Sequence, residues 1–158
     1  GYQWFSLQDF SMEARIEGVH ATGPILNRYI DEQLAEMGLE DKDLALVGFS
    51  QGTMMALHVG LRRPKACAGV LGYSGMLVDA DNLANEITVK PPILLCHGQD
   101  DEVLPFDFMP AALNTLRENG VPCEGLARPN LGHGIDDDGI KAGMFFLADV
   151  FGVKLQNI

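Results

Sequence analysis

Short apolar runs alternate with longer segments of mixed polarity along most of the chain. Residues 12–37 carry apolar or small residues every three or four positions, which predicts a long helix. Gly38 is placed to end this helix, and Pro24 predicts a kink or a break near Thr22–Gly23. Apolar runs then predict four strands, over residues 44–48, 66–73, 93–98 and 123–129. Further helices are predicted over residues 51–62, 106–119 and 138–151, with an irregular stretch over 74–90.

Strands that alternate with helices predict an α/β protein with a parallel sheet and right-handed crossovers. The first strand, "LALVG" at residues 44–48, is wholly apolar, which is typical of a strand buried on both faces. A parallel sheet normally shields such a strand at both edges, so we expect a neighbour that the chain does not obviously contain. The fourth strand is more mixed in polarity and is predicted to lie nearer an edge.

Composition narrows the class of protein. The chain has 158 residues, of which 47% are hydrophobic and 21% charged, so we expect one folded domain over residues 1–158. Its net charge of −11 disfavours nucleic acid and anionic lipid as partners. No apolar run reaches the roughly 18 residues that cross a bilayer, so no integral membrane segment is predicted.

The compartment is inferred from the cysteines. The chain has three of them, an odd number, and none forms a CxxC pair or lies near a histidine at metal-ligand spacing: Cys67, Cys96 and Cys123. We interpret them as reduced core residues and predict a cytoplasmic location. The chain begins with Gly1 and not methionine, so we expect it to start after a processed or truncated segment, which could have carried targeting signals.

The motif "GFSQG" at residues 48–52 places a serine where a strand turns directly into a helix. Such a turn forces Ser50 into a strained backbone, and the glycines at 48 and 52 let strand and helix pass closely. The serine oxygen then stands clear of the sheet above the N-terminus of the helix, which suits a developing negative charge. We therefore predict Ser50 as a nucleophile and the backbone N–H of Gln51 as an oxyanion donor. The alternative is a glycine-rich turn that a serine caps.

A serine nucleophile needs a base, and the base needs a carboxylate that orients it. In this type of fold the expected chain order is serine, acid, histidine. Asp100 and Asp101 follow the third predicted strand, and His133 follows the fourth. The carboxyl ends of parallel strands meet at one edge of a sheet, so these side chains are candidates for acid and base. Each alone could equally be a solvated turn residue or a surface histidine.

Other polar residues receive structural interpretations. His97 ends a buried strand and is predicted to make structural hydrogen bonds. His20 and His58 lie in predicted helices ahead of the expected positions, so neither is predicted as the base. Ser74 lacks the strand–turn–helix context and is predicted to be a pocket-wall or turn residue.

The motifs together resemble the phospholipase/carboxylesterase branch of the α/β-hydrolases, which includes the acyl-protein thioesterases. "GFSQG" matches that group's nucleophile motif, and "CHGQDDEVLP" (96–105) resembles its H-G-x-x-D-x-x-V-P segment, with Leu104 in the usual valine position. That match assigns the acid to Asp101 and not Asp100. "GHGI" resembles the histidine loop and gives His133, while "YSGML" and "YQWFSL" resemble two further segments. The resemblance implies an α/β-hydrolase fold and a serine hydrolase.

One departure from the family pattern concerns the region before Ser50. The family carries several strands and an H-G-x-G-like loop there, and that loop donates a second oxyanion N–H. No such loop precedes Ser50 in this chain. The resemblance therefore implies that the chain is the C-terminal part of a larger hydrolase. We expect the open sheet edge to be covered by homo-oligomer formation or by another association.

We predict hydrolysis of short- or medium-chain carboxylic esters, with a small-molecule or lipid-like acyl ester as substrate and no metal or organic cofactor. Five apolar residues near the predicted site could line an acyl pocket or simply pack in the core: Trp4, Phe5, Phe49, Met76 and Leu77. Thioesters and lysophospholipids remain alternative substrates. A non-catalytic or impaired hydrolase-like binding module is a further alternative, as is a dienelactone-hydrolase-like enzyme, which would carry cysteine in place of Ser50.

Overall fold

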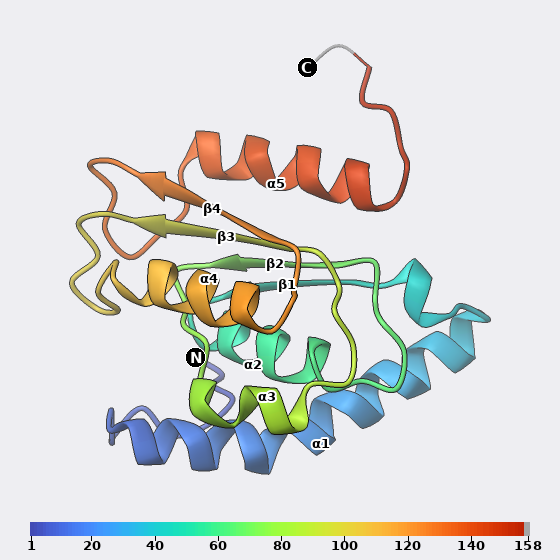
Figure 1. The fold of residues 1–158 in the computed structure, drawn as a ribbon, viewed down its shortest axis with the longest axis horizontal. Helices are drawn as coiled ribbons and strands as arrows, with labels where there is room; N and C mark the ends of the chain where they lie inside the picture. The colour runs from blue at the N-terminus through green and yellow to red at the C-terminus, as the bar shows by residue number, and fades with distance from the viewer. Residues whose placement is uncertain (157–158) are drawn as a thin grey trace.

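A computed structural model describes residues 1–156 and has one parallel sheet at its centre (Figure 1). Its four strands are hydrogen-bonded in chain order: β1 (Ala45–Phe49), β2 (Gly69–Tyr73), β3 (Ile93–Gly98) and β4 (Cys123–Arg128). Every neighbouring pair is parallel, with Phe49 opposite Tyr73 and Tyr73 opposite Cys96. The carboxyl ends of the strands therefore meet at one edge, as the sequence predicted.

Helices cover both faces of the sheet. The long helices are α1 (Met12–Met37), α2 (Gln51–Gly60), α4 (Phe108–Glu118) and α5 (Asp137–Val150). Short helical segments are η1 (Asp41–Asp43), η2 (Ala80–Asn82) and α3 (Leu83–Glu86), the last two within the stretch predicted to be irregular. In Figure 1, α5 lies alone above the sheet, while α2, α3 and α4 lie below it with α1 beyond them.

Helix α1 is unbroken at Pro24, so the alternative of a break near Thr22–Gly23 is wrong. Figure 1 shows instead that the axis of the helix changes direction along its length, as a proline that cannot donate to the preceding turn would cause. The Ser11 side chain caps the first turn by accepting the N–H of Ala14 at 3.1 Å. Gly38 ends the helix in the left-handed conformation, with φ 68°, as predicted.

Two apolar layers hold the sheet, one on each face. The face toward α2 and α4 carries the larger cluster, in which Leu57, Val70 and Leu116 are fully buried. On the other face, Leu71 and Leu94 pack with Phe146 of α5. A further cluster around Val19 and Val59 joins α1 to α2. The site described below is therefore carried on strand ends anchored from both sides.

Strand β1 lies at an edge of the sheet and is not buried on both faces, so that expectation is wrong. Val47 is 57% exposed, whereas the first residue of the strand, Ala45, is partly buried. The apolar composition of "LALVG" reflects packing of Leu46 toward α2 and leaves Val47 against solvent. Strand β4 is the other edge, as predicted. An association that covers β1 stays a prediction.

Three further predictions concern membrane helices, cysteines and location. None of the helices in residues 1–156 combines the length and the apolar character that crossing a bilayer demands. Within the same residues the three cysteines are free thiols, and Cys67 and Cys96 are buried. The cytoplasmic location stays a prediction.

Candidate active site

Ser50 occupies the sharp turn between β1 and α2. Its backbone has φ 54° and ψ −115°, a conformation that few non-glycine residues adopt. Gly48 makes the turn feasible, because a Cβ at this position would overlap the backbone of Gly52 and Thr53. Gly52 itself has open space where a Cβ would stand, so the close approach requires glycine at 48 and not at 52.

His133 reaches Ser50 from the loop after β4. Its Nε2 atom lies 3.1 Å from the Ser50 Oγ, and its Nδ1 atom lies 2.8 Å from Oδ2 of Asp101. A carboxylate can only accept, so Nδ1 carries the hydrogen and Nε2 is free to accept the Ser50 hydroxyl hydrogen. The structure thus brings the three residues selected from sequence into one hydrogen-bonded line.

Asp101 holds the buried end of this line, since its side chain has no exposed surface. Its Oδ1 accepts the backbone N–H groups of Val103 and Leu104, both at 2.9 Å. Burial acts to raise the pKa of Asp101. The hydrogen bond from His133 and the two backbone N–H groups outweigh that effect together, so the pKa lies below its ordinary value. Asp101 is therefore a carboxylate that can orient the imidazole. Asp100, the neighbouring candidate, is exposed and uses its backbone N–H to bind the Leu131 carbonyl.

His97 supports the acid loop, in the structural role predicted for it. It is buried, and its Nε2 donates to the Leu104 carbonyl at 2.8 Å and lies 3.3 Å from Oδ2 of Asp101. The same imidazole packs edge-on against Phe106, with ring centroids 6.1 Å apart. His97 therefore closes the turn that presents Asp101.

Ser74 supports the histidine loop, whereas its sequence context predicted a turn or pocket-wall residue. Its Oγ donates to the Gly134 carbonyl at 3.0 Å, next to His133, and the residue is 1% exposed. Its backbone N–H binds the Cys96 carbonyl at 2.9 Å, which ties the end of β2 to β3. Only its place after a buried strand hinted at this function.

Gln51 follows Ser50 directly and contacts the N-terminal segment through its side chain. Its N–H belongs to the first turn of α2, where backbone donors have no partner within the helix, as the predicted oxyanion role requires. Its side chain accepts the Trp4 N–H and donates to the Phe5 carbonyl, each at 3.0 Å. The N-terminal segment is thereby held beside Ser50, at the same end of the sheet as the strand tips (Figure 1).

A small pocket of about 50 Å³ opens beside Ser50. Its walls come from the N-terminal segment, the starts of α1 and α2 and the loop after β3: Phe5, Ser6, Leu7, Asp9, Phe10, Arg15, Ser50, Gln51, Met54, Val103 and Leu104. Of the five predicted pocket residues, only Phe5 lines it. Phe49 instead packs on the imidazole of His133, with centroids 5.0 Å apart.

The other predicted pocket residues have different surroundings. Trp4 is partly exposed at the surface and bonds to Gln51 through its backbone. Met76 and Leu77 are buried in the two clusters beneath the sheet, which is the core-packing alternative left open above. The pocket residues that sequence reasoning missed lie mostly in the irregular N-terminal segment, which has no periodic signal.

A larger hollow, of about 750 Å³, lies between β4 and α5. Pro92, Leu126, Phe145 and Phe146 are among its walls, and none of the three aligned residues is. Cys123 also lines the hollow, but its thiol donates to the Leu113 carbonyl and burial raises its pKa, so the largest hollow is not the best candidate for an active site.

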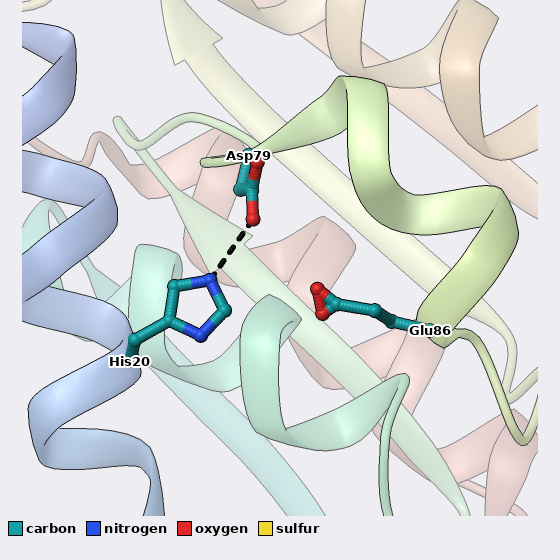
Figure 2. Close-up of side chains that lie close together, drawn as sticks. All are labelled: His20, Asp79 and Glu86. Carbon is teal, nitrogen blue, oxygen red and sulfur yellow. Dashed lines mark hydrogen bonds and ion pairs between the residues drawn. The ribbon is translucent and has the colours of Figure 1, made fainter.

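One cluster outside this site has side chains of the types that bind metals. Ligand atoms of His20, Asp79 and Glu86 lie within 4.8 Å of one another, and Figure 2 shows His20 bonded to Asp79 with Glu86 facing them. Each acid already has a partner. Asp79 binds His20 at 2.9 Å and Asn82 at 2.7 Å, and Arg62 lies 3.4 Å from Glu86. The positive charge of Arg62 beside Glu86 disfavours the binding of a cation. We therefore assign the cluster to packing between α1, α2 and α3.

Comparisons with known proteins agree with the geometry. A family model described as Phospholipase/Carboxylesterase matches residues 1–150. Carboxylesterase SOBER1 of Arabidopsis thaliana is 33% identical over 138 residues, which are 85% of this chain and 57% of that protein. Acyl-protein thioesterase 1 of Aspergillus fumigatus is 33% identical over 139 residues, 84% of this chain and 57% of that protein. The crystal structure of esterase PE8 is similar with a TM-score of 0.91 at 37% identity, covering 95% of this chain and 71% of that one. The chain thus spans somewhat more than half the length of the curated relatives it matches.

Proposed function

Because the chain belongs to the phospholipase/carboxylesterase family and has the α/β-hydrolase fold, we propose that it hydrolyses carboxylic esters with Ser50 as the nucleophile. The observation that carries the proposal is the hydrogen-bonded line from Ser50 through His133 to Asp101. A surface serine rarely has such partners, and the strained backbone at Ser50 is typical of a residue held for function.

In the proposed first half-reaction the Ser50 oxygen attacks the ester carbonyl carbon while its proton passes to Nε2 of His133. The negative charge that develops on the carbonyl oxygen is met by the Gln51 N–H and the N-terminus of α2. The intermediate collapses as the carbon–oxygen bond to the alcohol breaks. The leaving alkoxide takes the proton from His133, and an acyl group remains on Ser50.

In the second half-reaction water attacks the acyl carbon, with its proton again taken by His133. Collapse of that intermediate releases the carboxylic acid and returns the proton to Ser50. Asp101 stays ionised throughout, because its hydrogen bonds favour the carboxylate. It keeps the hydrogen on Nδ1 of His133 and stabilises the imidazolium that forms in each half-reaction.

A short acyl chain is the proposed substrate. The pocket of about 50 Å³ beside Ser50 has room for only a few carbon atoms, and Phe5, Leu7 and Met54 supply apolar walls. Gln51 is the proposed oxyanion donor, and removing one such donor typically costs about 10²- to 10³-fold in rate.

Turnover of 4-nitrophenyl esters with acyl chains of increasing length tests the proposal. We expect release of 4-nitrophenol to be fastest for acetate or butyrate and to fall for longer chains. The Ser50→Ala variant should reduce the rate to that of the buffer. Equal rates for the protein and Ser50→Ala would contradict the proposal.

A further inference from the structure

Arg15, in the first turns of α1, is a wall of the same pocket as Ser50. The arginine is partly buried. Its Nη1 donates to the sulfur of Met76 at 3.3 Å, and its guanidinium carbon lies 6.0 Å from the centre of the Phe108 ring. A thioether and an aromatic ring are weak partners that leave the positive charge uncompensated.

The contrast with the other arginines makes this arrangement unusual. Four arginines in the chain are at least partly buried, and all four lie within residues 1–156. Arg62, Arg63 and Arg128 each pair with one or two carboxylates. Within the described residues, Arg15 has no carboxylate oxygen within 4.0 Å. Arg15 is thus a pocket-wall residue with a partly buried guanidinium and no carboxylate partner, and such a group is suited to pair with an anion on a ligand.

One carboxylate, that of Asp9, lines the same pocket. Asp9 is exposed, and its side chain accepts the Ser11 N–H at 2.8 Å, at the cap of α1. That hydrogen bond lowers the pKa of Asp9, so it is ionised near neutral pH. Its carboxylate is not within 4.0 Å of the Arg15 nitrogens, so the two residues do not form an ion pair.

We propose that Arg15 makes this pocket selective for esters that carry a second, anionic group, a carboxylate or a phosphate, a few atoms from the scissile carbonyl. The inference rests on the proposed function, since it takes Ser50 as the reacting residue. Planar guanidinium groups bind carboxylates and phosphates through paired hydrogen bonds. The apolar walls from Leu7, Phe10 and Leu104 would receive the carbon atoms between the two ends. The anion can belong to the acyl group or to the leaving alcohol, and the test separates these two sources.

Equilibrium binding to the Ser50→Ala protein tests the inference without requiring turnover. The first pair of ligands is monomethyl glutarate and its neutral isostere, methyl 4-carbamoylbutanoate, which place the anion on the acyl side. The second pair is 4-acetoxybenzoate and 4-acetoxybenzamide, which place it on the leaving group. Ligand-observed NMR gives the dissociation constant of each.

We expect the anionic member of at least one pair to bind roughly tenfold to a hundredfold more tightly than the neutral one. Arg15→Met in the Ser50→Ala background should abolish that preference, and Arg15→Lys should keep part of it. Arg28→Met is the matched control, because it removes the same charge from an exposed position on α1 and should leave the preference unchanged.

Equal affinity for the charged and neutral members of both pairs would overturn the inference, as would a preference that survives Arg15→Met. An equal loss in Arg28→Met would also overturn it, since net charge would then explain the effect. These outcomes are distinct from failure of the proposed function, which is measured with the intact Ser50 protein on neutral 4-nitrophenyl esters.

Discussion

Nδ1 of His133 lies 2.8 Å from a carboxylate oxygen of Asp101, and the two residues come from loops that follow different strands. The loops are held separately. His97 donates to the acid loop at Leu104, and Ser74 donates to the histidine loop at Gly134. The imidazole therefore has little freedom to leave the line that connects it with Ser50.

Replacing Asp101 with Asn tests the orienting role of the carboxylate. Asparagine keeps the size of the side chain, but its NH2 group can donate to Nδ1. His133 is then expected to carry its hydrogen on Nε2, where it can no longer accept the Ser50 proton. We predict a fall in kcat of about 10³- to 10⁴-fold for a 4-nitrophenyl ester. A circular-dichroism melt checks that the variant is folded. A folded Asp101→Asn protein with undiminished kcat would rule out this role.

Replacing Ser74 with Ala removes the hydrogen bond to the Gly134 carbonyl. Because Ser74 is buried and the Gly134 carbonyl partly so, we expect a loss of about 1–3 kcal/mol in the free energy of unfolding, measured with urea. We also expect kcat to fall with little change in KM, since the histidine loop and not the pocket is loosened. Unchanged stability and kcat would show that the loop is held by other contacts.

The two glycines of the serine turn form a matched pair. A Cβ at Gly48 would overlap the backbone of α2, so Gly48→Ala should destabilise the fold by about 3 kcal/mol or more. A Cβ at Gly52 meets nothing within 4 Å, so Gly52→Ala, within α2, should be neutral or stabilising by up to about 1 kcal/mol. Chemical unfolding of both variants measures the difference, and similar losses in the two would contradict the close approach.

The stability of the protein should fall in mild acid because of His58. Burial lowers the pKa of His58 from 6.5 to about 4, with contributions from Arg62 and His20. The unfolded chain binds a proton below about pH 6.5 while the folded chain does not, so stability is lost as the pH falls from 6.5 toward 4. The full effect is roughly 3 kcal/mol.

The matching variant is His58→Gln, which cannot titrate. Urea unfolding at pH 7 and at pH 4.5 should show a smaller acid-induced loss in His58→Gln than in the unaltered protein. Carboxylates contribute to the loss in both proteins and cancel in the comparison. An equal loss in the two proteins would show that His58 is not held neutral by burial.

Much of the fold was predictable from sequence because its signals are local. The apolar runs located all four strands, Gly38 marked the end of α1, and the predicted end of the helix over 106–119 lies one residue from that of α4. Strand β1 was misjudged because composition records how apolar a strand is and not which neighbours it has. Pro24 was tolerated within α1 because a helix can bend there without ending.

The candidate site, like the fold, was predictable only where its sequence signals are local. Motif and chain order selected Ser50, Asp101 and His133, and the structure brings these three side chains together, while their catalytic role stays a prediction. The contacts of Ser74 and Arg15 were not predictable, because they join residues 60 and 61 positions apart in sequence. Met76 and Leu77 show the reverse error, since apolar residues near a site look alike whether they face a pocket or the core.

The most direct test of the central claim is covalent labelling with a fluorophosphonate, followed by peptide mapping of the adduct by mass spectrometry. We expect one adduct, on Ser50. Labelling should disappear in Ser50→Ala and slow strongly in His133→Ala, because the base that activates the hydroxyl is gone. A folded protein that remains unlabelled at Ser50, or that labels equally well without His133, would contradict it.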